Sequence, residues 1–207
     1  MLFGVTCPVC GAPGAAPCPA CVAELRPAPP LPAPPAVDRC LALLAYEGAG
    51  RELVARLKYR NHRAALPGLA AAMATLVDAG DYDVVTWLPT SAERRRARGF
   101  DQAELLAGVV ARRLSLPCRR LLERRPGPAQ TGRTLDQRRR GPVFVARTSA
   151  GTNAILVVDD IVTSGATATA GAVAVRAAGA TRVDVLAAAR TPLKPRSLPS
   201  DTERDAS

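Results

Sequence analysis

The sequence predicts an α/β fold, in which helices flank a parallel sheet, with a small cysteine-rich module before it. Short apolar runs at residues 84–88, 155–158 and 183–189 alternate with helical patterns, an order typical of parallel sheets. Four of the six cysteines stand in two C-x2-C pairs ahead of these elements. A chain of 207 residues that is 48% hydrophobic has room for one medium domain and such an appendage.

Composition narrows the possible partners and locations. The net charge of +10 comes mostly from arginine and favours polyanions, either phosphorylated small molecules or nucleic acid, without choosing between them. No run of 18 apolar residues exists, so the sequence predicts no membrane span. The first residues lack the basic region of a signal peptide, and we expect a cytoplasmic protein.

Residues 1–26 are predicted to form a metal-binding module. The two pairs, Cys7 with Cys10 and Cys18 with Cys21, supply four thiolates that suit tetrahedral zinc. Such a closed site has a structural role, because it leaves no open coordination position. An iron–sulfur or redox use of these cysteines stays open, whereas disulfides are the poorer interpretation in a cytosolic protein.

A proline-rich linker is expected at residues 27–37. Its run of prolines favours a stiff, extended polyproline conformation, which would hold the module at a distance from the main domain. The main domain is expected over residues 38–190. The polar residues 191–207, which include three prolines, are expected to be a disordered tail.

The main domain opens with elements that build the sheet and one of its faces. An edge strand and two helices are expected at residues 40–46, 51–58 and 66–77. Pro67 suits the first turn of the second helix. The next buried strand, at 84–88, is stopped by Pro89.

An arginine-rich loop follows that strand over residues 90–100. Arg94 and Arg98, with two further arginines between them, lie at the carboxyl end of a strand, where guanidinium groups suit a pyrophosphate. A solvated basic surface is the other interpretation of this charge run. Asp101 and Glu104 then form a capping-box-like start for a helix that reaches Leu114.

Short strands are expected near residues 121–122 and 143–145, on either side of a loop rich in glycine, proline and arginine. A loop of this length, at residues 124–140, is usually functional inside a compact domain. We expect it to fold over a bound ligand as a lid.

The most informative segment is the apolar run 155–158 followed by two acids and a small, hydroxylic turn. Asp159 and Asp160 come where the strand is expected to leave the core. The turn that opens the next helix, which runs to about Ala178, consists of Thr163, Ser164, Gly165, Ala166 and Thr167. Backbone N–H groups at a helix start bind phosphate, and the acids accept sugar hydroxyls. A buried strand with an acidic edge and an ordinary helix cap is the alternative, and an ATPase is disfavoured because no G-x-x-x-x-G-K-[ST] motif precedes the acids.

This segment resembles the phosphoribosyl pyrophosphate (PRPP) motif of type I phosphoribosyltransferases at every position. The resemblance implies a type I phosphoribosyltransferase-like parallel sheet flanked by helices. It also implies transfer of ribose 5-phosphate from PRPP to a nucleophile, with release of pyrophosphate. Mg²⁺ and arginines would neutralise the pyrophosphate, while Asp159 and Asp160 would hold the ribose hydroxyls as catalytic residues.

The wider pattern resembles the ComF family, which joins a four-cysteine zinc module to a phosphoribosyltransferase-like domain. The resemblance rests on the cysteine pairs, the acidic motif and three further segments, at residues 46–59, 98–102 and 129–138. The chain departs from the family at two places. Asp101 replaces the usual asparagine, and Arg140 and Gly141 stand where the family often has a further asparagine. The family association implies a role in natural competence and DNA uptake, with a helicase and a recombination mediator as partners.

Two functions from different classes remain open. The first is a PRPP-binding transferase whose acceptor the sequence does not identify. The second is a non-catalytic protein of the competence machinery that binds single-stranded DNA or acts as an adaptor. The low aromatic content of 3% weakens direct DNA binding, because few rings are available to stack on bases.

Overall fold

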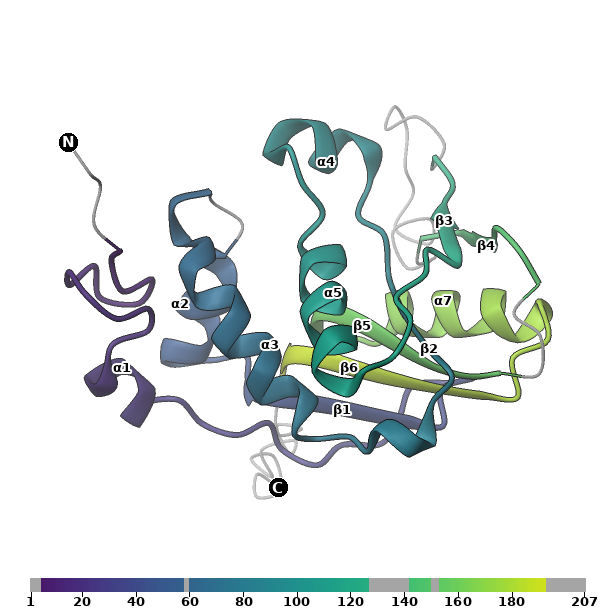
Figure 1. Cartoon of the computed structure of the whole chain (residues 1–207), viewed down its shortest axis with the longest axis horizontal. Coiled ribbons are helices and arrows are strands. Elements are labelled where there is room, and N and C mark those ends of the chain that lie inside the picture. The colour runs from purple at the N-terminus through teal and green to yellow at the C-terminus, as the bar shows by residue number, and fades with distance from the viewer. Residues whose placement is uncertain (1–4, 58–59, 127–141, 150–152, 193–207) are drawn as a thin grey trace, which may run out of the picture.

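The fold is a parallel sheet with helices on both faces, as the sequence predicts (Figure 1). It is seen in a computed structural model that describes residues 5–57, 60–126, 142–149 and 153–192, without the side chains of 60–62. The sheet has the order β1-β6-β5-β2, and every neighbouring pair is parallel. Its strands are β1 (Arg39–Ala45), β2 (Val84–Trp87), β5 (Ala154–Val162) and β6 (Arg182–Arg190).

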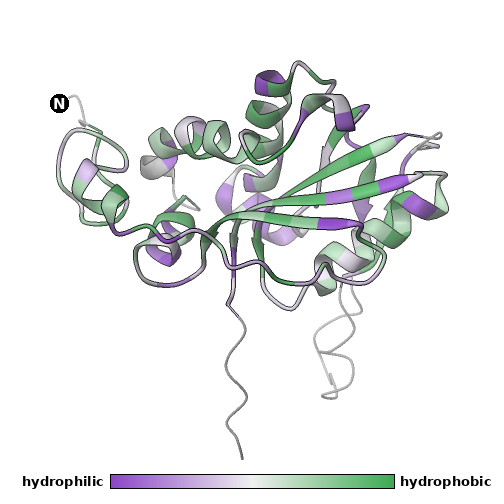
Figure 2. Cartoon of the chain, turned by 90° about the horizontal axis from the view of Figure 1, so that it is seen from below, coloured by the Kyte–Doolittle hydropathy of each residue, from purple (hydrophilic) through white to green (hydrophobic). Residues whose placement is uncertain are grey.

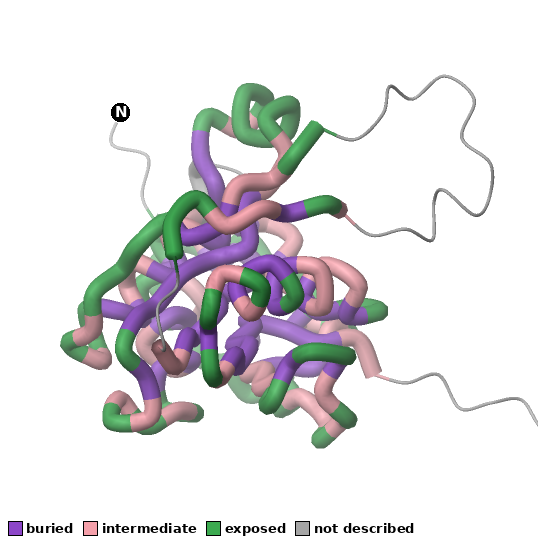
Figure 3. The backbone as a smooth tube through the Cα atoms, turned by 90° about the vertical axis from the view of Figure 1, so that its right-hand side faces the viewer, coloured by how far each residue is buried: buried purple, intermediate pink, exposed green. Residues whose placement is uncertain are grey.

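The central strands are buried on both faces, which explains their nearly continuous apolar sequence. Alternate residues of β5 enter different core clusters, with Leu156 and Val158 on one face and Ile155 and Val157 on the other. The strands accordingly appear buried in Figure 3 and hydrophobic along the middle of the molecule in Figure 2. The two faces therefore need two separate layers to cover them.

Among the described residues, three helices cover one face of the sheet and one helix covers the other. The first layer contains α2 (Gly48–Arg56), α3 (Leu66–Ala74) and α5 (Gln102–Leu114). The second contains α7 (Ala166–Ala177). Two short 3-10 helices serve as connections: η1 (Arg60–Ala65) joins α2 to α3, and η2 (Ala79–Asp81) lies between α3 and β2. Pro67 stands in the first turn of α3, where its missing N–H costs no hydrogen bond.

The second layer also includes a small hairpin that is separate from the main sheet. Strands β3 (Leu122–Arg124) and β4 (Phe144–Ala146) pair antiparallel, and Leu122 and Phe144 pack in the core beside α7. Both strands were predicted, at slightly different bounds. The predicted lid lies almost entirely in residues 127–141, which are outside the described residues, as is most of the predicted tail.

The N-terminal residues pack against the main domain, so the prediction of a spacer that holds the module away is wrong. The module contains α1 (Pro19–Ala23), and its Val9, Ala16 and Leu25 pack against the first core cluster. The following residues run along the sheet, where the Ala28 N–H donates to Leu43 (Figure 1). Most prolines of this segment are exposed, but Pro34 is buried, and the carbonyls of Leu31 and Pro32 accept from Arg190 of the domain.

In the described part of the chain, every helix is too short or too polar to span a bilayer.

Candidate functional site

The turn between β5 and α7 has the geometry of an anion-binding site. Gly165 is the N-cap of α7 and has a φ of 79°, in the left-handed region that glycine adopts without strain. The Ser164 hydroxyl accepts from the Ala166 N–H at 3.4 Å. The other N–H groups of the first turn have no acceptor within the helix, and the positive end of the helix dipole lies there.

A cavity of about 330 Å³ lies beside this turn, at the carboxyl ends of β2 and β5. Ligands of parallel α/β proteins bind at this end of the sheet. Six residues predicted for the ligand site line the cavity: Asp159, Asp160, Thr163, Thr167, Arg94 and Arg98. The predicted residues Ser164, Gly165 and Ala166 are not among its lining. Of these, Gly165 is buried and Ser164 is exposed.

The two acids lie inside the last part of β5, although the sequence suggested that the strand ends before them. The ladder to β6 continues past them, with Asp159 opposite Ala187 and Ile161 opposite Ala189. Asp159 is only 8% exposed, and its Oδ1 accepts from the Asp160 N–H at 2.8 Å. Strand hydrogen bonds therefore fix the position of both carboxylates at the floor of the cavity.

Burial and the closeness of the two acids disfavour the charged form of Asp159. Desolvation raises the pKa of Asp159 well above its usual range, and the nearby Asp160 carboxylate raises it further. Two carboxylates so close together favour a cation or a hydrogen-bond donor beside them. Sugar hydroxyls and a hydrated Mg²⁺ both meet that requirement.

The arginines across the cavity are carried by a helix, whereas the sequence predicted a loop. Helix α4 (Ala92–Arg98) begins at Ser91, whose side chain accepts from the Arg94 N–H, and ends at Gly99 with a φ of 76°. Three arginines in its last turn complement the negative end of the helix dipole. Arg94 and Arg98 line the cavity, while Arg95 lies near Glu104 at 3.8 Å.

Five further lining residues with polar side chains were not predicted for the site: Tyr46, Thr90, Asp101, Gln102 and Arg124. Asp101 is buried and accepts from the N–H groups of Thr90 and Ala103, so it ties the strand end to the start of α5. Burial lowers the pKa of Arg124, and the charge of Arg94 nearby lowers it further. The sequence did contain a signal for Arg124, a basic residue directly after a predicted strand.

The four cysteines of the module meet at one point, with all their sulfur atoms within 4.8 Å of one another. The Sγ atoms of Cys10 and Cys18 are 3.8 Å apart, close to the edge of a tetrahedron with zinc–sulfur bonds of about 2.3 Å. Burial raises the pKa of Cys7, but backbone N–H groups, including those of Cys10 and Cys18, lower it more, to about 6. This donor set fits a closed four-sulfur metal site.

No family model matches the chain, and none of the curated proteins compared with it matches. The chain is similar to solved structures, among them the allosteric regulatory enzyme of purine biosynthesis, with a TM-score of 0.41 and 23% identity. It is also similar to the glutamine PRPP amidotransferase from B. subtilis complexed with ADP and GMP (TM-score 0.41, 24% identity). A third is the purine phosphoribosyltransferase from Pyrococcus horikoshii Ot3 (TM-score 0.43, 16% identity).

These similarities cover 59%, 58% and 63% of this chain, respectively. The chain spans a quarter of the length of the first two structures and 78% of the third.

Proposed function

We propose that the cavity binds PRPP, or a related phosphoribosyl ligand, and transfers its ribose 5-phosphate to an acceptor with release of pyrophosphate. One observation carries the proposal. A glycine-started helix and two strand-held carboxylates stand opposite two arginines around a single cavity. These three groups suit the phosphate, the sugar hydroxyls and the pyrophosphate of one ligand.

Each group has a distinct part in the proposed reaction. The turn of Thr163, Ser164, Gly165, Ala166 and Thr167 holds the 5-phosphate through its N–H and hydroxyl groups. Asp159 and Asp160 accept the ribose hydroxyls. Arg94 and Arg98 hold the pyrophosphate, and bound Mg²⁺ supplies further neutralisation of its charge.

In the reacting step, the acceptor forms a bond to the anomeric carbon as the carbon–oxygen bond to pyrophosphate breaks. The bonding electron pair leaves with pyrophosphate. The carboxylates stabilise the positive charge that develops on the sugar, and the arginines stabilise the negative charge of the departing pyrophosphate. Catalysis by this arrangement depends on positioning and electrostatics.

Calorimetry tests the proposal directly. PRPP with Mg²⁺ is expected to bind the wild-type protein, and Asp160→Asn is expected to weaken binding by about 10- to 100-fold, because a hydrogen bond to a charged group is lost. Glu52→Gln is the matched control, since Glu52 is half exposed on α2, away from the lining of the cavity, and pairs with Arg56 at 3.3 Å. Absence of Mg²⁺-dependent binding to the wild type would refute the proposal.

We further propose that the cysteine module holds structural zinc. The purified protein is expected to contain about one zinc per chain, and Cys10→Ser to lose it, whereas Cys118→Ser, a change at an exposed and isolated cysteine, retains it. Elemental analysis by mass spectrometry gives the metal content. Iron instead of zinc, with visible absorbance, would establish the iron–sulfur alternative.

The same proposal includes membership of the ComF family and a cytoplasmic role in natural competence, alongside a helicase and a recombination mediator. Its support is the sequence pattern together with a cysteine cluster joined to a parallel sheet.

A second candidate, non-catalytic binding of single-stranded DNA, is favoured by exposed arginines that form no ion pair in the described part of the chain: Arg112, Arg113, Arg119 and Arg120. Anisotropy titrations with an oligonucleotide at low and high salt separate it from the first.

A further inference from the structure

We propose that residues 31–38, here called the strap, position the phosphate-binding turn and thereby increase the affinity of the cavity for its phosphorylated ligand. The strap is the second half of the proline-rich segment and the residues that lead into β1. It contributes nothing to the lining of the cavity, so its effect is exerted through Gly165 and α7. The identity of the ligand in this inference rests on the proposed function. The contacts between the strap and the turn do not depend on that function.

The first contact is between Pro34 and Gly165. Pro34 is buried, and a β-carbon placed on Gly165 would lie 2.6 Å from its Cγ atom and 2.8 Å from its Cβ atom. Side chains larger than hydrogen therefore do not fit at residue 165 while Pro34 is in place. The ring of Pro34 supports the turn from the side of the protein interior, at the residue where the backbone enters α7.

The second contact anchors the strap to the end of the sheet. Arg190, the last residue of β6, is 8% exposed and donates to the carbonyls of Leu31 at 3.1 Å and Pro32 at 2.6 Å. Arg190 lies opposite Val162 in the ladder, and Val162 is the residue from which the turn leaves β5. The strap and the turn are therefore fixed to the same pair of strand ends.

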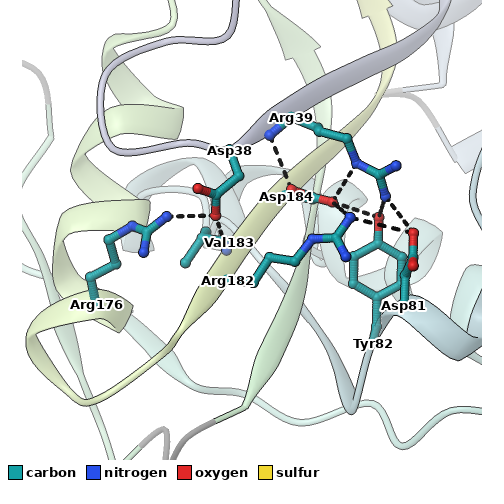
Figure 4. Close-up of polar contacts among 8 residues, drawn as sticks. All are labelled: Asp38, Arg39, Asp81, Tyr82, Arg176, Arg182, Val183 and Asp184. Carbon is teal, nitrogen blue, oxygen red and sulfur yellow. Dashed lines mark hydrogen bonds and ion pairs between the residues drawn. The ribbon is translucent and has the colours of Figure 1, made fainter.

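The third contact lies at the other end of α7. Arg176, in the last turn of this helix, donates through Nε to the Ala36 carbonyl at 2.9 Å and forms an ion pair with Asp38. Asp38 also accepts from the Val183 N–H of β6 at 2.7 Å (Figure 4). Because the strap holds both ends of α7, it limits sliding and tilting of the helix that presents its N–H groups to the ligand.

Prolines suit this task because their backbone is already restricted. A segment with few accessible conformations loses little entropy when it packs, and it keeps its neighbours in one arrangement. A turn that is ordered before the ligand arrives binds more tightly than one that has to be ordered on binding. The proline run is therefore explained as a support for the site rather than as a spacer.

The test compares Pro34→Ala with Pro30→Ala, since Pro30 is an exposed proline of the same proline-rich segment but lies outside the strap. Pro34→Ala is expected to raise the dissociation constant for PRPP with Mg²⁺ about tenfold, whereas Pro30→Ala leaves it unchanged. Arg190→Lys is a second variant, because a lysine ammonium lacks the rigid fork by which the two Nη atoms of Arg190 reach both carbonyls, and it is expected to weaken binding in the same direction. Equal affinity of Pro34→Ala and wild type would overturn the inference.

Hydrogen–deuterium exchange supplies a readout that needs no ligand. In Pro34→Ala, the amides of residues 163–169 are expected to exchange several-fold faster than in the wild type, while those of β6 keep their protection. If the wild type does not bind PRPP but this difference is present, the proposed function fails and the support by the strap stands. Unchanged exchange at residues 163–169 would show that the strap does not order the turn.

Discussion

Replacing Asp184 with alanine is expected to lower the free energy of unfolding by about 2–4 kcal/mol, because a buried carboxylate that accepts several hydrogen bonds is removed. The Asp184 side chain is fully buried in β6 and accepts from the Arg39 backbone N–H at 3.0 Å and from its Nε at 2.8 Å. Arg182 lies 3.1 Å away, and the Tyr82 hydroxyl donates at 2.9 Å (Figure 4).

The size of the effect follows from what the substitution leaves behind. Burial, followed by the Asp184 carboxylate, raises the pKa of Tyr82 to about 12, so its hydroxyl stays protonated and needs an acceptor. Without Asp184, this hydroxyl and two guanidinium groups lose their shared partner.

Urea denaturation measures the loss, and Asp81→Ala is the control. Asp81 contacts Arg39 and Arg182 from a side chain that is 35% exposed, so its removal is expected to cost about 1 kcal/mol or less. Equal losses for the two variants would show that burial of Asp184 does not determine its contribution.

Replacing Gly50 with alanine is expected to destabilise the protein by about 2–3 kcal/mol through overpacking. A β-carbon on Gly50 would lie 2.5 Å from the carbonyl oxygen of Ala45, a backbone atom that a rotamer change cannot move. Ala45 is held by the main chain, because it is paired with Arg190 in β6 and its N–H donates to Arg26. Helix α2 would therefore have to move away from the end of β1.

Gly108→Ala is the matched control, since Gly108 lies in α5 and a β-carbon there would have no neighbour within 4 Å. It is expected to leave stability unchanged or to raise it by up to about 1 kcal/mol, through helix propensity alone. Thermal unfolding followed by circular dichroism measures both variants. If Gly50→Ala is as stable as Gly108→Ala, the close packing of α2 on β1 is refuted.

The sheet was the part of the fold most readily predicted from the sequence. Strands such as β5 and β6 are apolar on both faces, and this pattern depends little on the rest of the structure. The end of β5 was harder to predict, because Asp159 and Asp160 are polar residues that stay in the ladder at the floor of a cavity. Helix α4 was missed for a related reason: with no buried residue, it has no apolar face to detect.

The lining of the cavity was predicted in part, because its two acids, two threonines and two of its arginines lie in continuous motifs. The ligand that these residues bind stays a prediction. Residues such as Tyr46 and Arg124 reach the cavity only through the packing of distant elements, which periodicity does not report. The docking of the proline-rich segment was missed because it depends on Arg190, more than 150 residues away along the chain. Contacts of this range have no local signal.

The strand order has a consequence for synthesis of the chain. Strand β6, the last of the described strands, lies between β1 and β5, so two-thirds of the neighbouring strand pairs in the four-stranded sheet require residues 182–190. During translation, β1 has no neighbouring strand in the sheet to pair with until almost all the described residues have been synthesised. During that interval its unpaired edge is open to other chains, and a product that stops before residue 182 is expected to aggregate.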